Sequence, residues 1–559
     1  MAENLQKSEF KDGEFAPWSR GAAFNAQWTY SYVNNAPYYA KVRGTFKQFM
    51  QRFVQNWLWW YDGWVPYFHN AERGIMNTNL AKALVDRTAK KVSGSRTMFK
   101  NAFDEDRRIP STEVNPSLKT ISKWAAETNW TRTKLKAITF ALAAGTSLVK
   151  IDKAADGKYI TDAIRLDRFL PVLSADGKVQ EVIIFLLLNI DIVSNEKKAH
   201  PTYTLEEHRY FGKYVKADGT VIERAPLVEY QVHNYQNTVQ NGTAVESEYS
   251  GRVNWNDIPK DIRAIIKNRY GVRVDEPILL PFVDSLGCEI VKATECIGNI
   301  PDLPLGESLL ANIIPMLQEY DYYHSAFCTD MYLGRGKVLV PLALQSPMSP
   351  YYAGGAYEGL DTTMYTKLPA TNPDEQSPLP VQFELRAEDW RRIRDTIIEN
   401  IAVNTGLSST TIASFLNDNS AKTAREISTE ENETAGFVDS MRGIIEVPLN
   451  RILDMVAKQL GCEDKVVIRW SNASLQNKYT TAETLALARQ AGFISLRKAV
   501  QEFNSDDDDV QVQEEYERIL KEEPSVPSES DSQDFFGEGL NDDNKTTQSA
   551  GESDNGRFE

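Results

Sequence analysis

The chemistry that this chain could perform depends first on its five histidines, His69, His200, His208, His233 and His324. None of them forms the HxxxH or HExxH spacing that places two imidazoles on one face of a helix for a metal ion. His200 and His208 are eight residues apart beside strand-like sequence, which is a weak signal for metal ligation. We therefore expect no metal site.

Two runs of acidic residues, 104–106 and 506–509, are the next candidates. Metal-dependent nucleases need carboxylates that the fold brings together from separate segments, whereas a single run is typical of a solvated loop or a helix N-terminus. The chain also lacks the GxxxxGK[ST], GxGxxG and GxSxG motifs. We predict no catalytic residues and no cofactor.

The composition is that of a large acidic globular protein. The chain has 559 residues, a net charge of −16 and a pI near 5.1. Its 62 Lys and Arg are outnumbered by 78 Asp and Glu. This acidic balance disfavours tight DNA binding, which needs cations to neutralise phosphates, although DNA can still slide past such a surface. The four cysteines share no CxxC spacing and fit thiols of a reducing compartment.

The elements that would position any site alternate between helical and β-rich regions. The fold is expected to be α+β, mainly helical in its second half, and the Trp-rich stretch 57–68 is expected to pack in a core or subunit interface. The first twenty residues are polar, and the apolar run 182–188 is too short to span a bilayer, so a soluble cytosolic protein is expected.

The predicted elements are a helix at 79–94, two helices and a strand over 117–151, hairpins at the ADG turns 155–157, 175–177 and 217–219, helices at 307–334, 387–406, 421–460 and 476–522, and strands at 337–344 and 381–385.

The segment FLNDNSAKTAREISTEENE, residues 415–433, has helix-forming residues but almost no apolar face. Helices in proteins gain most of their stability from an apolar face, so a neighbouring copy of the chain or an aqueous space must border this one. The preceding residues 405–421 are small and polar and are predicted to form a loop. An amphipathic helix, a polar loop and a polar helix in this order suit a symmetric ring whose loop projects into a central opening.

Seven segments carry a family resemblance through their order in the chain. They are LAKALVDRTAKKVSG, AITFALAAGTSLVKI, DRFLPVLSADGKVQEVIIF, PLGESLLANIIPMLQEYDYYHSAFCTDMYLGRGKVLVP, EDWRRIRDTIIENIAVNTGL, AKTAREISTEENETAGFVDSMRGIIEVPLNRIL and ISLRKAVQEFNSDDDDVQVQEEYERILKEE. In this order, over roughly residues 75–522, the sequence resembles the portal proteins of tailed bacteriophages, which form a ring at one capsid vertex. Residues 345–380 are rich in Pro, Gly, Ser and Tyr and are expected to form a long loop. This loop and residues 1–70 have no counterpart in the resemblance.

The resemblance implies a portal-like division into wing, stem, clip and crown. It gives residues 1–305 to the wing region, 306–333 to a first stem helix, 334–385 to the clip, 386–406 to a second stem helix, 407–420 to a tunnel loop, 421–474 to a long bent wing helix with a following strand, and 475–522 to the crown. The Ser-, Asp- and Gly-rich residues 523–559 are expected to be a disordered acidic tail. Pro448, inside the long helix, is expected to bend it.

The same resemblance implies two groups of site residues. The tunnel loop and DNA channel would comprise Ser408, Ser409, Thr410, Thr411, Asn417, Asp418, Asn419, Ser420, Lys422 and Arg425, and the clip would dock its partners through Tyr351, Tyr352, Tyr357 and Tyr365. Lys422 and Arg425 either form a modest phosphate-binding ring or pair with Glu426 and Glu430 of neighbouring subunits.

The implied function is a portal ring of twelve subunits, without catalysis, that carries DNA during packaging and ejection. The implied partners are other copies of the chain, double-stranded DNA, the terminase large subunit, the head–tail adaptor, and the major capsid and scaffolding proteins, with no membrane. The ring would assemble in the host cytoplasm and reside at the portal vertex of the virion. Two alternatives stay open: another phage head or neck structural protein, and a metal-dependent nuclease or hydrolase acting through residues 104–106.

Overall fold

The chain divides into two compact units, Met1–Leu475 and Gln476–Glu559. The structure, a computed structural model, describes residues 55–63, 75–94, 97–101, 116–154, 156–173, 178–187, 200–216, 218–240, 243–282, 284–294, 305–333, 337–341, 365–368, 379–381, 386–415, 424–470, 478–504 and 509–522. Runs of helices and mainly antiparallel sheets give the α+β class expected from the sequence.

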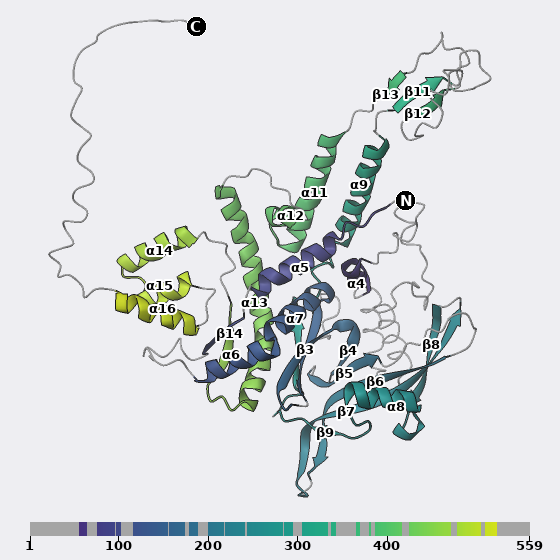
Figure 1. The fold of residues 1–559 in the computed structure, drawn as a ribbon, viewed down its shortest axis with the longest axis vertical. Coiled ribbons are helices and arrows are strands. Elements are labelled where there is room, and N and C mark those ends of the chain that lie inside the picture. The colour runs from purple at the N-terminus through teal and green to yellow at the C-terminus, as the bar shows by residue number, and fades with distance from the viewer. Residues whose placement is uncertain are drawn as a thin grey trace, which may run out of the picture. The chain divides into compact units, whose positions relative to one another are not determined.

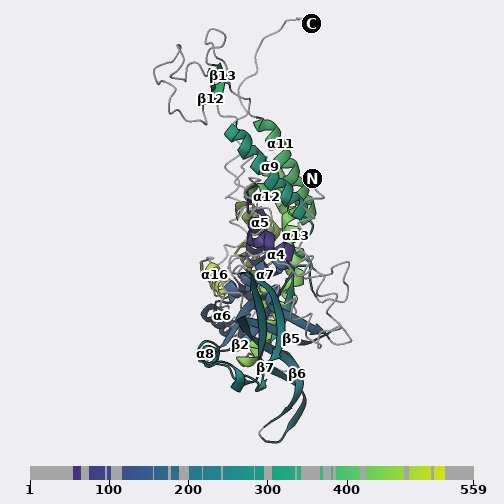
Figure 2. The same ribbon diagram turned by 90° about the vertical axis from the view of Figure 1, so that its right-hand side faces the viewer.

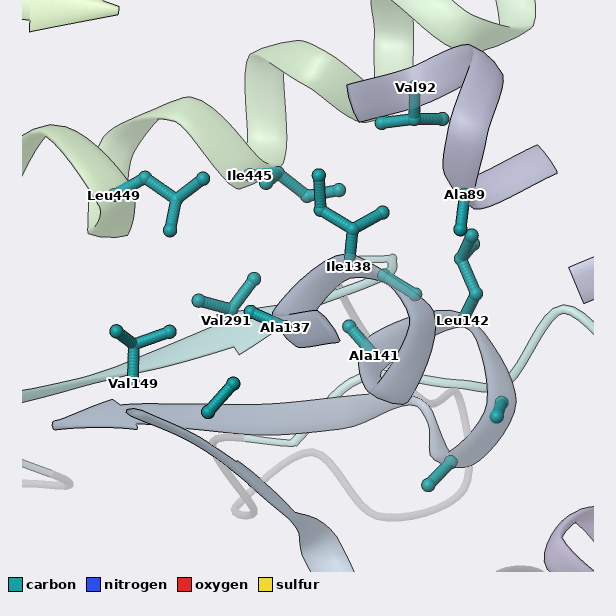
Figure 3. Close-up of a cluster of buried hydrophobic side chains, with 14 of the residues drawn as sticks. Ala89, Val92, Ala137, Ile138, Ala141, Leu142, Val149, Val291, Ile445 and Leu449 are labelled. Atoms are coloured by element: carbon teal, nitrogen blue, oxygen red, sulfur yellow. The ribbon is translucent and has the colours of Figure 1, made fainter. Parts of the chain in front are cut away.

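The core of the first unit forms where three helices meet a small sheet. Apolar residues of α7 (Trp130–Ala144) recur at helical spacing, and alanines among them allow close approach by its neighbours. Figure 3 shows this α7 stripe between α5 (Leu80–Ser93) and α13 (Ala424–Gln459) on one side and β2 (Thr146–Lys153) and β10 (Cys288–Lys292) on the other. The labelled residues are all buried. Packing against α5 and the sheet therefore fixes the position of α13.

Further elements extend this core. In α4 (Gln55–Asp62), Trp57, Leu58 and Trp60 are buried in the same cluster, which confirms the core role expected for this part of the Trp-rich stretch. α6 (Pro116–Thr128) packs beside a two-stranded sheet in which β1 (Met98–Asn101) pairs with β14 (Val466–Arg469). That pairing joins segments more than 350 residues apart in sequence.

All three hairpins predicted from the ADG sequences are formed by the strands that flank these sequences. The first joins β2 to β3 (Tyr159–Arg165), the second joins β4 (Phe169–Leu173) to β5 (Val179–Leu187), and the third joins β6 (His200–Val215) to β7 (Val221–Gln240). β3 completes the sheet β10-β2-β3, while β8 (Thr243–Arg252) and β9 (Ile278–Leu279) complete a six-stranded sheet in which β9 pairs with β7. A second apolar cluster includes Leu205 and Val232 of this sheet and residues of α8 (Lys260–Ile265). Short helical turns occupy Leu166–Arg168, Trp255–Asp257 and Ile266–Tyr270.

A buried ion-pair network joins the three-stranded sheet to the six-stranded one. Glu207 of β6 accepts from Lys150 Nζ of β2 at 2.8 Å and from Arg209 Nε at 2.6 Å, and Asp152 of β2 also pairs with both cations. Arg209 Nη1 donates to the carbonyls of Ile151 and Gly287, both at 3.0 Å. Burial alone would raise the pKa of Glu207, but Lys150 and Arg209 outweigh it and lower that pKa to about 2. The carboxylate is therefore held charged between the sheets.

Two helices, α9 (Ile314–Leu333) and α11 (Ala387–Thr405), lie side by side and project from the core (Figures 1 and 2). Between them in sequence comes a small sheet with the order β12-β11-β13. Its strands are β11 (Lys337–Pro341), β12 (Tyr365–Leu368) and β13 (Leu379–Val381), with β12 parallel to β11. Figure 1 shows the sheet at the end of the pair farthest from α5 and α7.

The chain then turns through α12 (Ser409–Phe415) into α13, which continues through Pro448. The bend expected at this proline stays a prediction. The second unit contains α14 (Lys478–Gln490), α15 (Leu496–Phe503) and α16 (Asp509–Glu522). Among the described helices, none has the length and apolar character needed to cross a lipid bilayer.

Three expectations need correction. The first projecting helix begins at Ile314 rather than near residue 307, because turns precede Pro315, which then occupies the first helical turn. The 345–380 segment is not entirely loop, since it contains β12 and the start of β13. Residues 409–415, expected to be loop, form α12.

Candidate functional site

The projecting pair is held together at its outer end by aromatic and charged contacts. Trp390 of α11 lies edge-on to Tyr323 and Phe327 of α9, with ring centroids 5.9 and 6.1 Å away. Asp330 of α9 accepts from the Trp390 indole at 3.3 Å and from Arg386 at 2.6 Å. These contacts keep the two helices together where they meet the small sheet.

At its inner end, α9 is joined to the core by buried polar contacts. Asp321 accepts from the Thr78 amide at 3.0 Å and from its hydroxyl at 2.7 Å, just before α5 begins. Ser325 Oγ accepts from the Met76 amide at 2.7 Å. Both α9 side chains are buried, so the orientation of the projecting pair depends on the position of α5.

The outer surface of α11 remains open in the single chain. Glu388, Arg391 and Arg392 are largely exposed and pair only weakly within the helix, at 3.9–4.0 Å. Val403 is 83% exposed. A single exposed valine is common on protein surfaces, but its place on a projecting helix makes this surface a candidate contact for a second copy.

A hydroxyl cluster closes the turn from α11 into α13. Ser408 Oγ accepts from the Thr411 amide at 3.2 Å and thereby caps α12, and the hydroxyls of Ser408, Thr411 and Thr434 lie within 3.0 Å of one another. Ser408 and Thr411 were expected to face a channel. Both are buried because they make these contacts, so we correct their assignment: they hold α12 against α13.

A second polar contact fixes α13 against α5. Arg442 of α13 donates to the carbonyls of Lys91 and Val92 at 3.2 and 3.1 Å, and Lys134 of α7 donates to that of Ser93 at 2.7 Å. Both side chains thus donate hydrogen bonds to carbonyl groups in the last turn of α5, which lack partners within the helix. Burial, with a smaller contribution from nearby Arg442, lowers the pKa of Lys134 to about 7.

Replacing Lys134 with methionine should remove a pH dependence from the stability of the first unit. Between pH 7 and 10.5 the folded lysine is mostly neutral and the unfolded lysine is protonated, so the wild-type free energy of unfolding rises with pH, by up to about 1.4 kcal/mol per pH unit. The methionine variant lacks this contribution. Urea midpoints at pH 7, 8 and 9 measure the difference.

The matched control is Lys119→Met, which removes an exposed lysine from neighbouring α6. This variant should follow the wild-type pH dependence. Parallel pH curves for wild type and Lys134→Met would show that Lys134 stays protonated in the folded chain.

A cluster of carboxylates and imidazoles lies across β5, β6 and β7. His208 Nδ1 is 2.8 Å from Glu181, and His208 Nε2 and His233 Nε2 are 3.1 and 3.4 Å from Glu206 Oε2. Burial would lower the pKa of His208, but its hydrogen bonds to Glu181 and Glu206 outweigh this effect and raise it to about 9. In the described residues, Glu206, His208 and His233 form a group that can hold a metal ion.

Sequence spacing missed this cluster because the ligands face one another across a hairpin. Spacing along the chain suggested only His200 with His208, whereas β6–β7 pairing places His233 opposite Thr204, on the same face as Glu206 and His208. Counting outward from the ADG sequence at 217–219 does not recover this register: it would pair His233 with Tyr203, on the opposite face, and the irregularity between Gly212 and Tyr214 shifts the pairing by one residue to Thr204.

Most of the other predicted site residues lie outside the described residues or have side chains outside them. Ser409 is half-buried at the start of α12. Thr410, Arg425 and Tyr365 lie in described elements, but their side chains are outside the described set. Residues 104–106, 351, 352, 357, 417–420 and 422 lie outside the described residues altogether.

Comparison with known families gives one match that spans most of the chain. A family model described as "Phage portal protein, SPP1 Gp6-like" matches residues 60–526. This range includes nearly all the described elements, from within α4 to the end of α16. No curated protein matches the chain.

Proposed function

The chain belongs to the SPP1 Gp6-like family of phage portal proteins, and on this premise we propose that its copies form a ring at one capsid vertex that conducts DNA during packaging and ejection. The observation that carries the proposal is the match over residues 60–526, because it includes the core, the projecting pair and the second unit. The family is structural rather than enzymatic, so the nuclease alternative loses its support.

In this ring, α9 and α11 are the proposed stem and the small sheet is part of the proposed clip. The anchoring of α9 to the segment before α5 supports this assignment, because a stem must transmit force to the body of its subunit. The exposed surface of α11 is the proposed contact between neighbouring stems. Twelve subunits would complete the ring.

The set of proposed channel-facing residues is smaller than the set expected from the sequence. With Ser408 and Thr411 buried, the proposal rests on the segment that joins α12 to α13, with Asn417, Asp418, Asn419 and Ser420, and on Lys422 and Arg425 after it. Ser409 and Thr410, at the start of α12, stay in the proposed set. A lining with few cations forms few phosphate contacts, and each avoided contact removes affinity that would oppose sliding.

The proposed partners are those that the portal family implies. We assign docking of the terminase large subunit and then the head–tail adaptor to the clip, with Tyr351, Tyr352, Tyr357 and Tyr365 as contact candidates. The second unit corresponds to the proposed crown, facing the capsid interior with its scaffolding and major capsid proteins. The assembled ring would reside in the virion.

Electron microscopy of the purified full-length chain tests the proposal. We expect closed rings with a central hole, with residues 416–423 lining that hole in a reconstruction. Monomers or open filaments under assembly conditions would contradict it and favour a different head or neck protein. A closed ring lined by another segment would overturn the channel assignment alone.

A further inference from the structure

We propose that Glu206, His208 and His233 bind one divalent transition-metal ion, with Zn²⁺ the best match to the ligand types. All three residues come from the two longest strands of the six-stranded sheet, β6 and β7 (Figure 1). The antiparallel register pairs His233 with Thr204, so its side chain shares a face with those of Glu206 and His208. The site therefore forms when these strands pair in the native register.

The distances among the ligand atoms fit a tetrahedral ion. Zinc binds imidazole nitrogen and carboxylate oxygen at about 2.0–2.2 Å, so neighbouring ligand atoms of a tetrahedral site are about 3.4 Å apart. Glu206 Oε2 is 3.1 Å from His208 Nε2 and 3.4 Å from His233 Nε2. One atom from each residue lies within 4.8 Å of the other two. Glu206 Oε2 therefore already lies at the spacing of zinc ligands from both imidazoles.

A neighbouring carboxylate orients one of these ligands. His208 Nδ1 lies 2.8 Å from Glu181 of β5 and is placed to donate to it. A proton on Nδ1 leaves Nε2 with a lone pair directed at the proposed ion. This carboxylate–histidine–metal arrangement is common around bound zinc and strengthens the imidazole as a ligand.

The second oxygen of Glu206 supplies an independent observation. Glu206 is fully buried, and its Oε1 has no hydrogen-bond partner among the residues that the structure describes. An unpartnered buried carboxylate oxygen costs about 1–3 kcal/mol or more. Coordination by both oxygens would satisfy Oε1 and give the ion four contacts, in a geometry distorted from a regular tetrahedron because the two oxygens of one carboxylate lie close together. The alternative for the same space is a second proton on His208, which would satisfy Oε2 but leave Oε1 without a partner.

The proposed ion joins β6 to β7, and through Glu181 it involves β5. Its ligands are buried, so we assign the site a structural role in fixing the register of this sheet. Binding displaces any proton from Nε2 of both histidines. The inference does not depend on ring formation, because every ligand comes from one chain.

Metal analysis of untagged full-length protein tests the proposal. We expect about one zinc ion per chain after purification, and about one Co²⁺ per metal-depleted chain with the visible absorption of a tetrahedral site. His233→Gln and Glu206→Gln should lose the bound metal. Glu181→Gln should keep the ligands but weaken metal affinity about 10- to 100-fold.

The matched control is His324→Gln, which removes a histidine of α9 outside the cluster and should leave metal content unchanged. Circular dichroism of each variant separates metal loss from unfolding. If wild-type protein contains no transition metal and takes up no Co²⁺ after depletion, the proposal is wrong and the protonated histidine occupies the site. Unchanged metal content in folded His233→Gln and Glu206→Gln would also overturn it.

Discussion

Replacing Gly145 with alanine should severely destabilise the first unit, by at least about 3 kcal/mol. Gly145 ends α7 with a φ of +81°, and a Cβ there would lie 2.3 Å from the carbonyl oxygen of Gly306. The position of a Cβ is fixed by its own backbone, and the Gly306 oxygen is a backbone atom, so no side-chain rotation relieves the clash. The Gly145 carbonyl also accepts from the Ala293 amide at 3.0 Å, which restricts movement of the turn.

This contact matters for function because Gly306 begins the segment that leads to the proposed stem. Ser308 donates to the carbonyls of Leu142 and Ala143 at 3.0 and 2.8 Å, at the end of α7. A displaced Gly306 would strain these bonds and change the direction of α9. Any Gly145→Ala protein that folds should therefore also form fewer closed rings by electron microscopy.

The matched control is Gly157→Ala. Gly157 has nearly the same backbone conformation, with a φ of +85°, but a Cβ there meets nothing within 4 Å. This variant should incur only the backbone cost of about 1–2 kcal/mol. Chemical denaturation compares the two variants with wild type, and equal losses of stability would show that the clash at Gly306 relaxes freely.

The local elements of this fold were predictable because their signals are local. α5 was predicted as a helix at 79–94, and the structure places it at Leu80–Ser93. The three hairpins were predicted from the ADG sequences, and two of their glycines, Gly157 and Gly219, have positive φ. In these segments, propensity and tertiary packing agree.

Features that depend on contacts between distant segments could not be predicted. Ser408 and Thr411 resemble loop residues because they are small and polar, but Thr434 satisfies their hydroxyls from α13. Glu206 and His233 are close only because of strand register, which spacing along the chain does not reveal. Sequence order could indicate the family, whereas the depth at which each polar side chain lies depends on tertiary structure.

Replacing Glu207 with glutamine should cost about 3–5 kcal/mol, the range expected when one partner of a buried ion pair is removed. The amide keeps the shape of the carboxylate but loses its charge, which leaves Lys150 and Arg209 buried with Asp152 as their remaining carboxylate in the network. Because Glu207 joins two sheets, the loss should lower the urea midpoint of the whole first unit.

The pH dependence gives a second measurement. The pKa of Glu207 is lowered to about 2 in the folded chain, so the stability it contributes is fully present above its unfolded pKa near 4.5 and is lost as pH falls toward 2. The stability difference between wild type and Glu207→Gln should therefore shrink over this range. A difference that stays constant would show that Glu207 is not charged in the folded protein.

Glu223→Gln is the matched control for the charge change. Glu223 lies on β7 of the same sheet and pairs with Lys213 at 3.0 Å, but both side chains are more than half exposed. Exposed pairs contribute about 1 kcal/mol or less. If Glu223→Gln and Glu207→Gln lower the urea midpoint equally, burial does not strengthen the network between the two sheets, and those sheets must be joined mainly by their apolar contacts.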